Sequence, residues 1–140
     1  NSGLHDGMYW KYVEHFVEQG VMRAIDFWSS ILNSVKGPKP KVIYRTTIAT
    51  AAWARKAAFN PHKMEVFNYM FVEKLKRSRL LWGVIDGFDL TYAWHYDNNC
   101  SDGVHYGKPP AKAKWYGNVG HQYFVDLMLV HILLNAICIS

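Results

Sequence analysis

The chain has 140 residues, of which 50% are hydrophobic and 16% aromatic, and its formal net charge is +5. This length is enough for one domain with a buried core, and the composition excludes an intrinsically disordered protein. The basic residues lie mainly at 36–41 and 74–79, two short runs that are typical of solvated loops and helix ends, although such a patch could also meet phosphate or anionic lipid. No signature of an RNA- or DNA-reading module is present, so nucleic acid is not expected as a partner.

The first predicted element is a long helix. Apolar residues recur at helical spacing from about Tyr9 to Val35, and Gly20 is expected to kink or split this helix. The sequence KGPKP at 36–40 breaks it. The β-branched and aromatic run KVIYRTT at 41–47 then predicts a short buried strand. Residues 51–59 fit either a helix or a loop.

The second half of the chain repeats this alternation. A helix is expected after Asn60-Pro61, with basic residues at its C-terminal end, and a strand at 81–86. A long loop covers about 95–119, and the last helix covers about 121–138. We interpret this last helix as buried and His131 within it as a core or interface residue. The apolar run at 125–139 is shorter than the roughly 20 residues that span a bilayer, so no membrane span is expected.

This order of helices and strands predicts an α/β fold with a parallel sheet covered by helices. In such folds the active site lies beyond the carboxyl ends of the strands. Three segments fall at or beyond expected strand ends: residues 1–6, residues 45–47, and the loop that carries Asp102 and His105. Because two strands are too few for a doubly wound sheet, further strands are expected to precede Asn1.

The loop sequence Asp102-Gly103-Val104-His105 has the composition of a catalytic acid–base pair. A serine hydroxyl attacks an ester only when a histidine takes its proton, and a carboxylate on the other ring nitrogen orients that histidine. An aspartate and a histidine three residues apart on a turn can pack together, and Gly103 allows the turn a positive φ. The same short pattern also arises by chance, as an ordinary surface pair in a loop.

Four ordered pieces of the sequence resemble the SGNH/GDSL hydrolases, and within them the PC-esterase branch. That branch includes the trichome-birefringence-like polysaccharide acetyltransferases and the neurexophilin-and-esterase-domain proteins. NSGLHD at 1–6 resembles the Gly-x-Asn/His block that follows a central strand, and VIYRTT at 42–47 resembles the strand that ends in Arg-Thr. GVIDGFDLTYA at 83–93 resembles the next strand and loop, and DGVHY at 102–106 matches the final Asp-x-x-His block.

The resemblance implies that residues 1–140 are the C-terminal part of a single domain, a three-layer α/β/α sandwich that lacks its N-terminal strands here. It implies a serine esterase or O-acyltransferase that acts on acyl esters, such as acetyl esters, of a carbohydrate or similar hydroxyl compound. His105 would be the general base, Asp102 its orienting carboxylate, and Asn1, Gly3 and His5 donors around the oxyanion. Neither a metal nor a cofactor is implied, and the family points towards the secretory pathway.

Other candidate residues have two interpretations each. Arg45 would bind a substrate carboxylate or form an ion pair with Asp86 or Asp89. Core packing is the expected role of Trp28 and Trp82, whereas Trp94 and Trp115 could equally contact a sugar or pack. A zinc site would need His95, Cys100, His105 and His121, but their spacing matches no standard zinc pattern. The two cysteines, Cys100 and Cys138, allow one disulfide at most.

The family's nucleophile belongs to a Gly-Asp-Ser block, and this sequence has none. Ser101 abuts Asp102 in the same tight loop and is poorly placed to attack a substrate. The chain is therefore either the C-terminal half of an enzyme whose serine lies before Asn1 or on a partner chain, or a catalytically inactive, hydrolase-like scaffold in a larger assembly.

Overall fold

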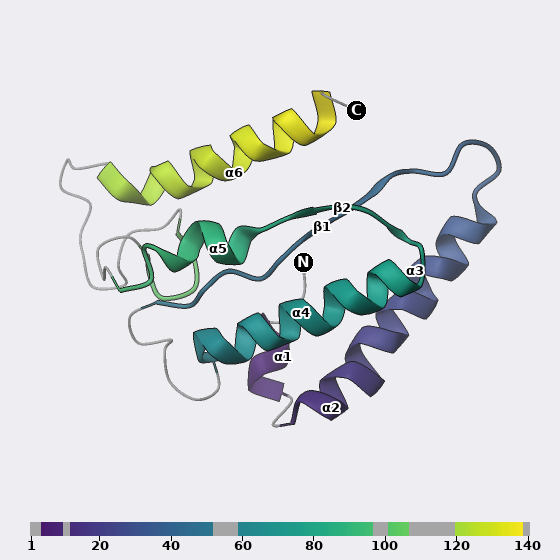
Figure 1. The fold of residues 1–140 in the computed structure, drawn as a ribbon, viewed down its shortest axis with the longest axis horizontal. Helices are drawn as coiled ribbons and strands as arrows, with labels where there is room; N and C mark the ends of the chain where they lie inside the picture. Colours follow the sequence, from purple (N-terminus) through teal and green to yellow (C-terminus); the bar gives the residue numbers. More distant parts are fainter. Residues whose placement is uncertain (1–3, 10–11, 52–58, 97–100, 107–119, 139–140) are drawn as a thin grey trace.

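The computed structural model describes residues 4–9, 12–51, 59–96, 101–106 and 120–138. It is a mixed α/β structure in which helices predominate and two strands form a parallel sheet (Figure 1). The strands are β1 (Val42–Arg45) and β2 (Leu81–Ile85). The α/β character and the parallel pairing confirm this part of the sequence prediction.

The predicted first helix is continuous from Val13 to Ser34, and Gly20 lies in a π-helical segment within it rather than at a split. A separate helix α1 (Leu4–Tyr9) precedes α2 (Val13–His15), and a π-helical segment η1 (Phe16–Val21) contains the glycine before α3 (Met22–Ser34) begins. A π-helical turn widens the helix and rotates the side chains that follow. Here it brings Phe16 and Val21 to the same buried side as Ile25 of α3.

The crossover between the two strands is α4 (Pro61–Arg77), whose start is specified locally. The Asn60 side chain accepts a hydrogen bond of 2.9 Å from the backbone N–H of His62, and Pro61 takes the first helical position. The crossover allows Val42 to pair with Leu81 and Arg45 with Ile85, so both strands point the same way.

Two further helices follow β2. The short helix α5 (Gly87–Tyr92), which the sequence analysis did not predict, begins at once because Asp86 caps it: its carboxylate accepts hydrogen bonds of 3.1 Å from the N–H groups of Phe88 and Asp89. The last helix is α6 (Gly120–Cys138), in agreement with the prediction. In Figure 1 the strands run between α4 on one side and α6 on the other.

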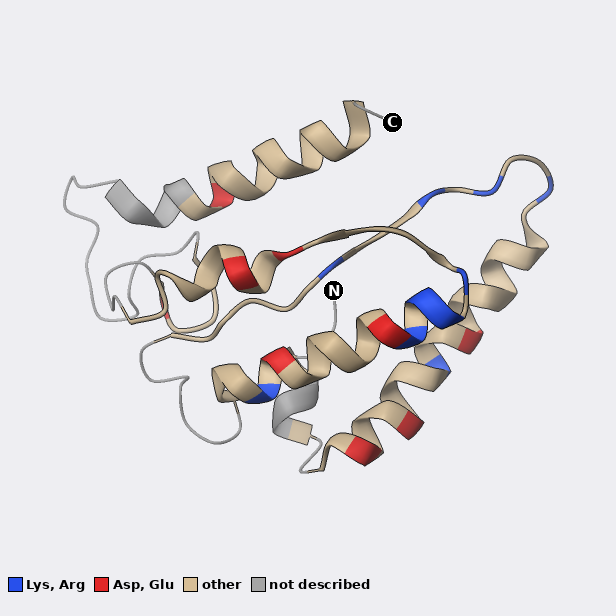
Figure 2. Cartoon of the chain, viewed as in Figure 1, with Lys and Arg blue, Asp and Glu red and all other residues tan. Residues whose placement is uncertain are grey.

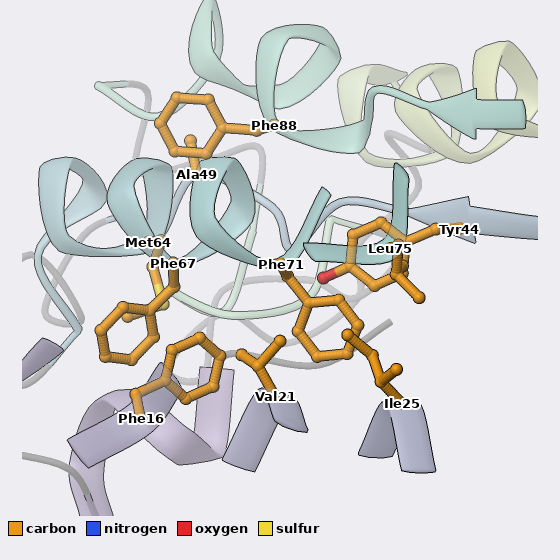
Figure 3. Close-up of a cluster of buried hydrophobic side chains, with 10 residues drawn as sticks. All are labelled: Phe16, Val21, Ile25, Tyr44, Ala49, Met64, Phe67, Phe71, Leu75 and Phe88. Carbon is orange, nitrogen blue, oxygen red and sulfur yellow. The ribbon is translucent and has the colours of Figure 1, made fainter. Parts of the chain in front are cut away.

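The main core lies between the sheet, α4 and the first helical segments (Figure 3). Phe16 stacks on Phe67 with ring centroids 4.0 Å apart, and Tyr44 of β1 stacks on Phe71 at 4.8 Å. Such aromatic pairs add about 0.5–1.5 kcal/mol to the free energy of burial. They fix α4 against both the π-helical segment and β1.

Three expectations about apolar residues were wrong. The helix α6 is not buried along its length, since Leu127 is 66% exposed and Leu134 53% exposed. His131 is exposed, so the core alternative was wrong and the interface alternative stays a prediction. Trp28 and Trp82 are also half exposed rather than part of the core. For α6 the physical reason is that the described sheet has two strands, which are too few to cover the whole apolar surface of this helix.

Candidate functional site

The loop at 101–106 is folded by the Asp102 carboxylate. One of its oxygens, Oδ1, accepts hydrogen bonds from the backbone N–H groups of Val104 (3.0 Å) and His105 (2.8 Å). Gly103, between Asp102 and Val104, has a φ of +108°, a left-handed conformation that a side chain would strain. The Asp-Gly sequence therefore determines a tight turn, and the turn brings His105 back towards Asp102.

The second carboxylate oxygen contacts the histidine ring. Asp102 Oδ2 lies 2.8 Å from His105 Nδ1, and the His105 side chain remains 52% exposed. With Nδ1 held by the carboxylate, the neutral imidazole carries its proton on Nδ1 and offers Nε2 as the base. This is the arrangement in which a histidine accepts a proton from a nucleophile.

The charge state of Asp102 suits that role. Partial burial by itself would raise the pKa of its carboxyl, but hydrogen bonds from the Val104 N–H, the His105 ring and the His105 N–H outweigh burial. The pKa of Asp102 is consequently held below its ordinary value. The carboxylate is therefore ionised at neutral pH and can stabilise an imidazolium at His105.

Two hydrogen bonds attach this loop to the segment that follows β1. The N–H of Ala51 donates to the carbonyl of Gly103 (2.9 Å), and the buried Tyr106 hydroxyl donates to the carbonyl of Ala49 (2.7 Å). Tyr106 also belongs to a second buried cluster, together with Ile48, Ala51 and Val125 of α6. The loop thus lies beyond the carboxyl end of β1, where the topology predicted a site.

The segment at 46–51 is itself held by buried polar side chains. Asn68 of α4 accepts from the Thr47 N–H (2.7 Å) and donates to the Thr47 carbonyl (2.8 Å), and Thr91 of α5 accepts from the Ala49 N–H (2.9 Å). Thr46 donates to Asp86 (2.9 Å). These side chains form hydrogen bonds with backbone N–H and C=O groups that a neighbouring strand would otherwise bind. The sequence did not reveal that Asn68 holds Thr47 or that Thr91 holds Ala49, because these partners lie about 20 and 40 residues away.

The other predicted site residues are only partly located. Arg45 lies at the carboxyl end of β1, where its side chain passes beside Gly87. The described residues contain no ion pair between Arg45 and Asp86 or Asp89, so that alternative was wrong; Asp86 instead caps α5. His5 lies on α1 and is exposed, and no hydrogen bond or ion pair between described residues joins it to His105. Asn1 and Gly3 lie outside the described residues.

None of the described serines serves His105. Within the described part of the chain, every hydrogen bond of His105 is made with Asp102. Ser101 is 1% exposed, and its hydroxyl accepts from the Gly103 N–H, which supports the expectation that it is not a nucleophile. Ser30 and Ser34 donate to carbonyls of their own helix.

The residues considered for metal binding and sugar contact have structural roles where they are described. The His95 ring is 3% exposed, bonds the Tyr92 carbonyl through Nδ1 and stacks on Tyr92. Trp94 packs against the cluster that contains Tyr106. Among the described residues, no three His, Cys, Asp or Glu side chains are grouped as metal ligands. Cys100, Trp115 and the side chain of His121 lie outside the described part.

A groove of about 380 Å³ lies at the same end of the sheet, between α4 and α5. Its apolar floor includes Val72, Val84 and Phe88, and its carboxylates come from both helices. This groove could not be predicted from the sequence, because its lining residues extend from Thr46 to Asp89. The full lining consists of Thr46, Glu65, Asn68, Tyr69, Val72, Glu73, Lys76, Val84, Asp86, Phe88 and Asp89.

Comparisons of the chain with protein-family models, curated proteins and solved structures found no match. Among the described helices, none is both long and apolar enough to cross a membrane.

Proposed function

We propose that this chain supplies the acid–base half of an SGNH-type serine esterase or O-acyltransferase of the PC-esterase branch. Its substrate would be an acyl ester, such as an acetyl ester, of a carbohydrate or similar hydroxyl compound. The observation that carries the proposal is the 2.8 Å contact between Asp102 Oδ2 and the half-exposed His105 ring at Nδ1, in the loop beyond the end of β1. The sequence resemblance supplies the reaction class.

In the proposed reaction, His105 Nε2 takes the proton of a serine hydroxyl as that oxygen attacks the ester carbonyl. The Asp102 carboxylate holds Nδ1–H and stabilises the imidazolium that forms. The imidazolium then returns the proton to the departing alcohol oxygen, which leaves an acyl-serine. Water or an acceptor hydroxyl, activated by the same histidine, attacks that acyl group and releases the serine.

The nucleophilic serine is proposed to come from a segment before Asn1 or from a partner chain. Donors near Asn1, Gly3 and His5 would stabilise the tetrahedral oxyanion, and Arg45 would contact the substrate at the end of β1. His5 is exposed in the described structure and is therefore accessible for this role.

The complete domain is proposed to be a three-layer α/β/α sandwich. Among the described residues β1 pairs only with β2, so its other edge is available for further parallel strands. The helix α6 is apolar on several sides, and such a helix is normally enclosed on more than one side. Additional strands beside β1 and helices against α6 would provide that enclosure.

A fluorophosphonate probe tests the enzyme proposal. The native protein is treated with the probe and the adduct is mapped by peptide mass. We expect a labelled serine upstream of Asn1 or on an associated chain, and we expect His105→Ala to slow labelling by about 10²–10⁴-fold because the base is lost. A matched control, His62→Ala, removes an exposed histidine that contacts Glu65 rather than Asp102, and it should leave labelling unchanged.

One observation favours the second candidate, an inactive hydrolase-like scaffold. Every hydrogen bond of His105 within the described residues stays inside its own turn. If the folded native protein takes no label at all, the esterase proposal is wrong, and a stable complex isolated with the unlabelled protein would support the scaffold.

A further inference from the structure

The fold brings the two basic runs of the sequence to one end of the molecule. The connections at 35–41 and 78–80 each lead into a strand, and the first residues of those strands, Val42 and Leu81, are register partners. Because the strands are parallel, both connections must lie at the amino end of the sheet. Figure 2 shows the Lys and Arg positions of the first connection and of the end of α4 at this end.

Five exposed basic residues make up what we call the basic end surface: Lys36, Lys39, Lys41, Arg77 and Arg79. The two connections, 35–41 and 78–80, contain no Asp or Glu. The ion pairs of the described residues involve none of the five. Their positive charge is therefore not neutralised by a carboxylate within this part of the chain.

Apolar side chains are exposed within the same surface. Trp82, the second residue of β2, is 44% exposed, and the ammonium of Lys41 lies 4.3 Å from the centre of its ring. Val35, which precedes Lys36, is 38% exposed. An exposed Trp beside lysines suits the boundary between lipid headgroups and acyl chains, where an indole ring is favoured and ammonium groups reach anionic headgroups.

We propose that the basic end surface binds peripherally to an anionic lipid bilayer. Clusters of four to eight Lys and Arg residues attract acidic phospholipids, and the exposed Trp82 and Val35 would enter the interface. The exposed apolar groups favour a bilayer over a soluble polyanion, which binds through charge alone. Since the Asp102–His105 loop lies beyond the opposite end of the sheet, this binding does not depend on the proposed function.

Vesicle co-flotation tests the inference. The protein is mixed with vesicles of phosphatidylcholine alone and of phosphatidylcholine containing phosphatidylserine. We expect flotation only with the second kind. Replacing Lys36, Lys39 and Lys41 by Gln should weaken partitioning into the vesicles by about a hundredfold, because each lysine near the anionic surface contributes to the binding free energy. The matched control replaces Arg23, Arg45 and Lys63 by Gln, which removes the same charge outside the basic end surface and should weaken partitioning far less.

A second variant separates a bilayer from a charged polymer. Trp82→Ala should lower vesicle binding at raised salt, where the apolar contribution dominates, and should leave retention on immobilised heparin unchanged. Circular dichroism confirms that each variant is folded. Equal flotation of the two Gln variants would overturn the inference, as would heparin retention without any flotation.

Discussion

At the scale of single residues, Asp102 does two things with one carboxylate. Its Oδ1 accepts two backbone N–H groups and so folds the turn, while its Oδ2 holds the His105 ring. The turn and the acid–base pair are therefore formed together. A substitution at this position separates the two roles if it keeps the acceptor but removes the charge.

We expect Asp102→Ala to lower the free energy of unfolding by about 1–3 kcal/mol, because two backbone donors lose their acceptor. Asp102→Asn retains an oxygen acceptor and should cost clearly less. Urea denaturation at neutral pH measures both. Equal losses for the two variants would show that the turn does not depend on the side-chain acceptor.

The lowered pKa of Asp102 makes part of this stability dependent on pH. A carboxyl whose pKa is lower when folded than its unfolded value of about 3.9 stabilises the fold above that pH. The contribution is lost as pH falls through the folded pKa. The difference in unfolding free energy between wild type and Asp102→Asn should therefore shrink below about pH 4, and a constant difference down to pH 2 would contradict this account.

Tyr106 anchors the same loop from its other end. Tyr106→Phe removes the hydroxyl that donates to the buried Ala49 carbonyl, and we expect a loss of about 1–2 kcal/mol. Tyr69→Phe is the control, because that side chain is 64% exposed and its hydroxyl should matter little. Thermal unfolding distinguishes them; similar midpoints for the two variants would mean that the loop is held by other contacts.

At the scale of secondary-structure elements, the end of β1 and the start of α5 approach each other closely. Asp86 caps α5 and binds Thr46, and Gly87 follows where the two backbones meet. A methyl group at Gly87 would lie 3.0 Å from the Thr46 carbonyl oxygen. A side chain at this position would therefore require the backbone to shift by a few tenths of an ångström, at the segment to which the candidate site is attached.

Gly87→Ala should destabilise the protein by about 1–3 kcal/mol, because backbone atoms rather than a side-chain end must move. Gly83→Ala in β2 is the matched control: its added methyl group would meet nothing within 4 Å, and alanine loses less backbone entropy on folding. Equilibrium unfolding in urea compares the two. A Gly87→Ala protein as stable as the control would mean that α5 moves away from β1 at little cost.

At the scale of the whole molecule, α6 is unevenly packed. Val125 is fully buried in the cluster that contains Tyr106, whereas Leu127 and Leu134 are more than half exposed. The helix thus fastens the site loop at one end and presents an apolar surface along the rest. The proposed sandwich would cover that surface.

We expect Val125→Ala to cost about 1–3 kcal/mol and Leu134→Ala to change stability by less than about 0.5 kcal/mol in this chain alone. If further strands and helices enclose α6 in the complete protein, Leu134→Ala should become costly there. Denaturation of both forms measures the change. A Leu134→Ala variant that remains neutral in the complete protein would mean that this face of α6 is never covered.

Much of the fold was specified locally and could be predicted from the sequence. The predicted bounds of β1, α4, β2 and α6 lie within a few residues of the observed ones. They were predicted from the breaker at 36–40, the Asn60-Pro61 helix start and the alternation of strand and helix patterns. The Asp102–His105 pair could also be predicted as a possibility, because three-residue spacing on an Asp-Gly turn brings both side chains together.

Only the tertiary structure decided how those elements pack and which distant residues bind one another. It showed that α6 is largely exposed, that Asp86 caps a helix rather than pairing with Arg45, and that Asn68 and Thr91 hold the segment beneath the site loop. Caps and turns are formed by neighbours in sequence, so sequence reveals them. Burial, long-range hydrogen bonds and the meeting of the two basic runs depend on residues tens of positions apart, which only the folded chain brings together.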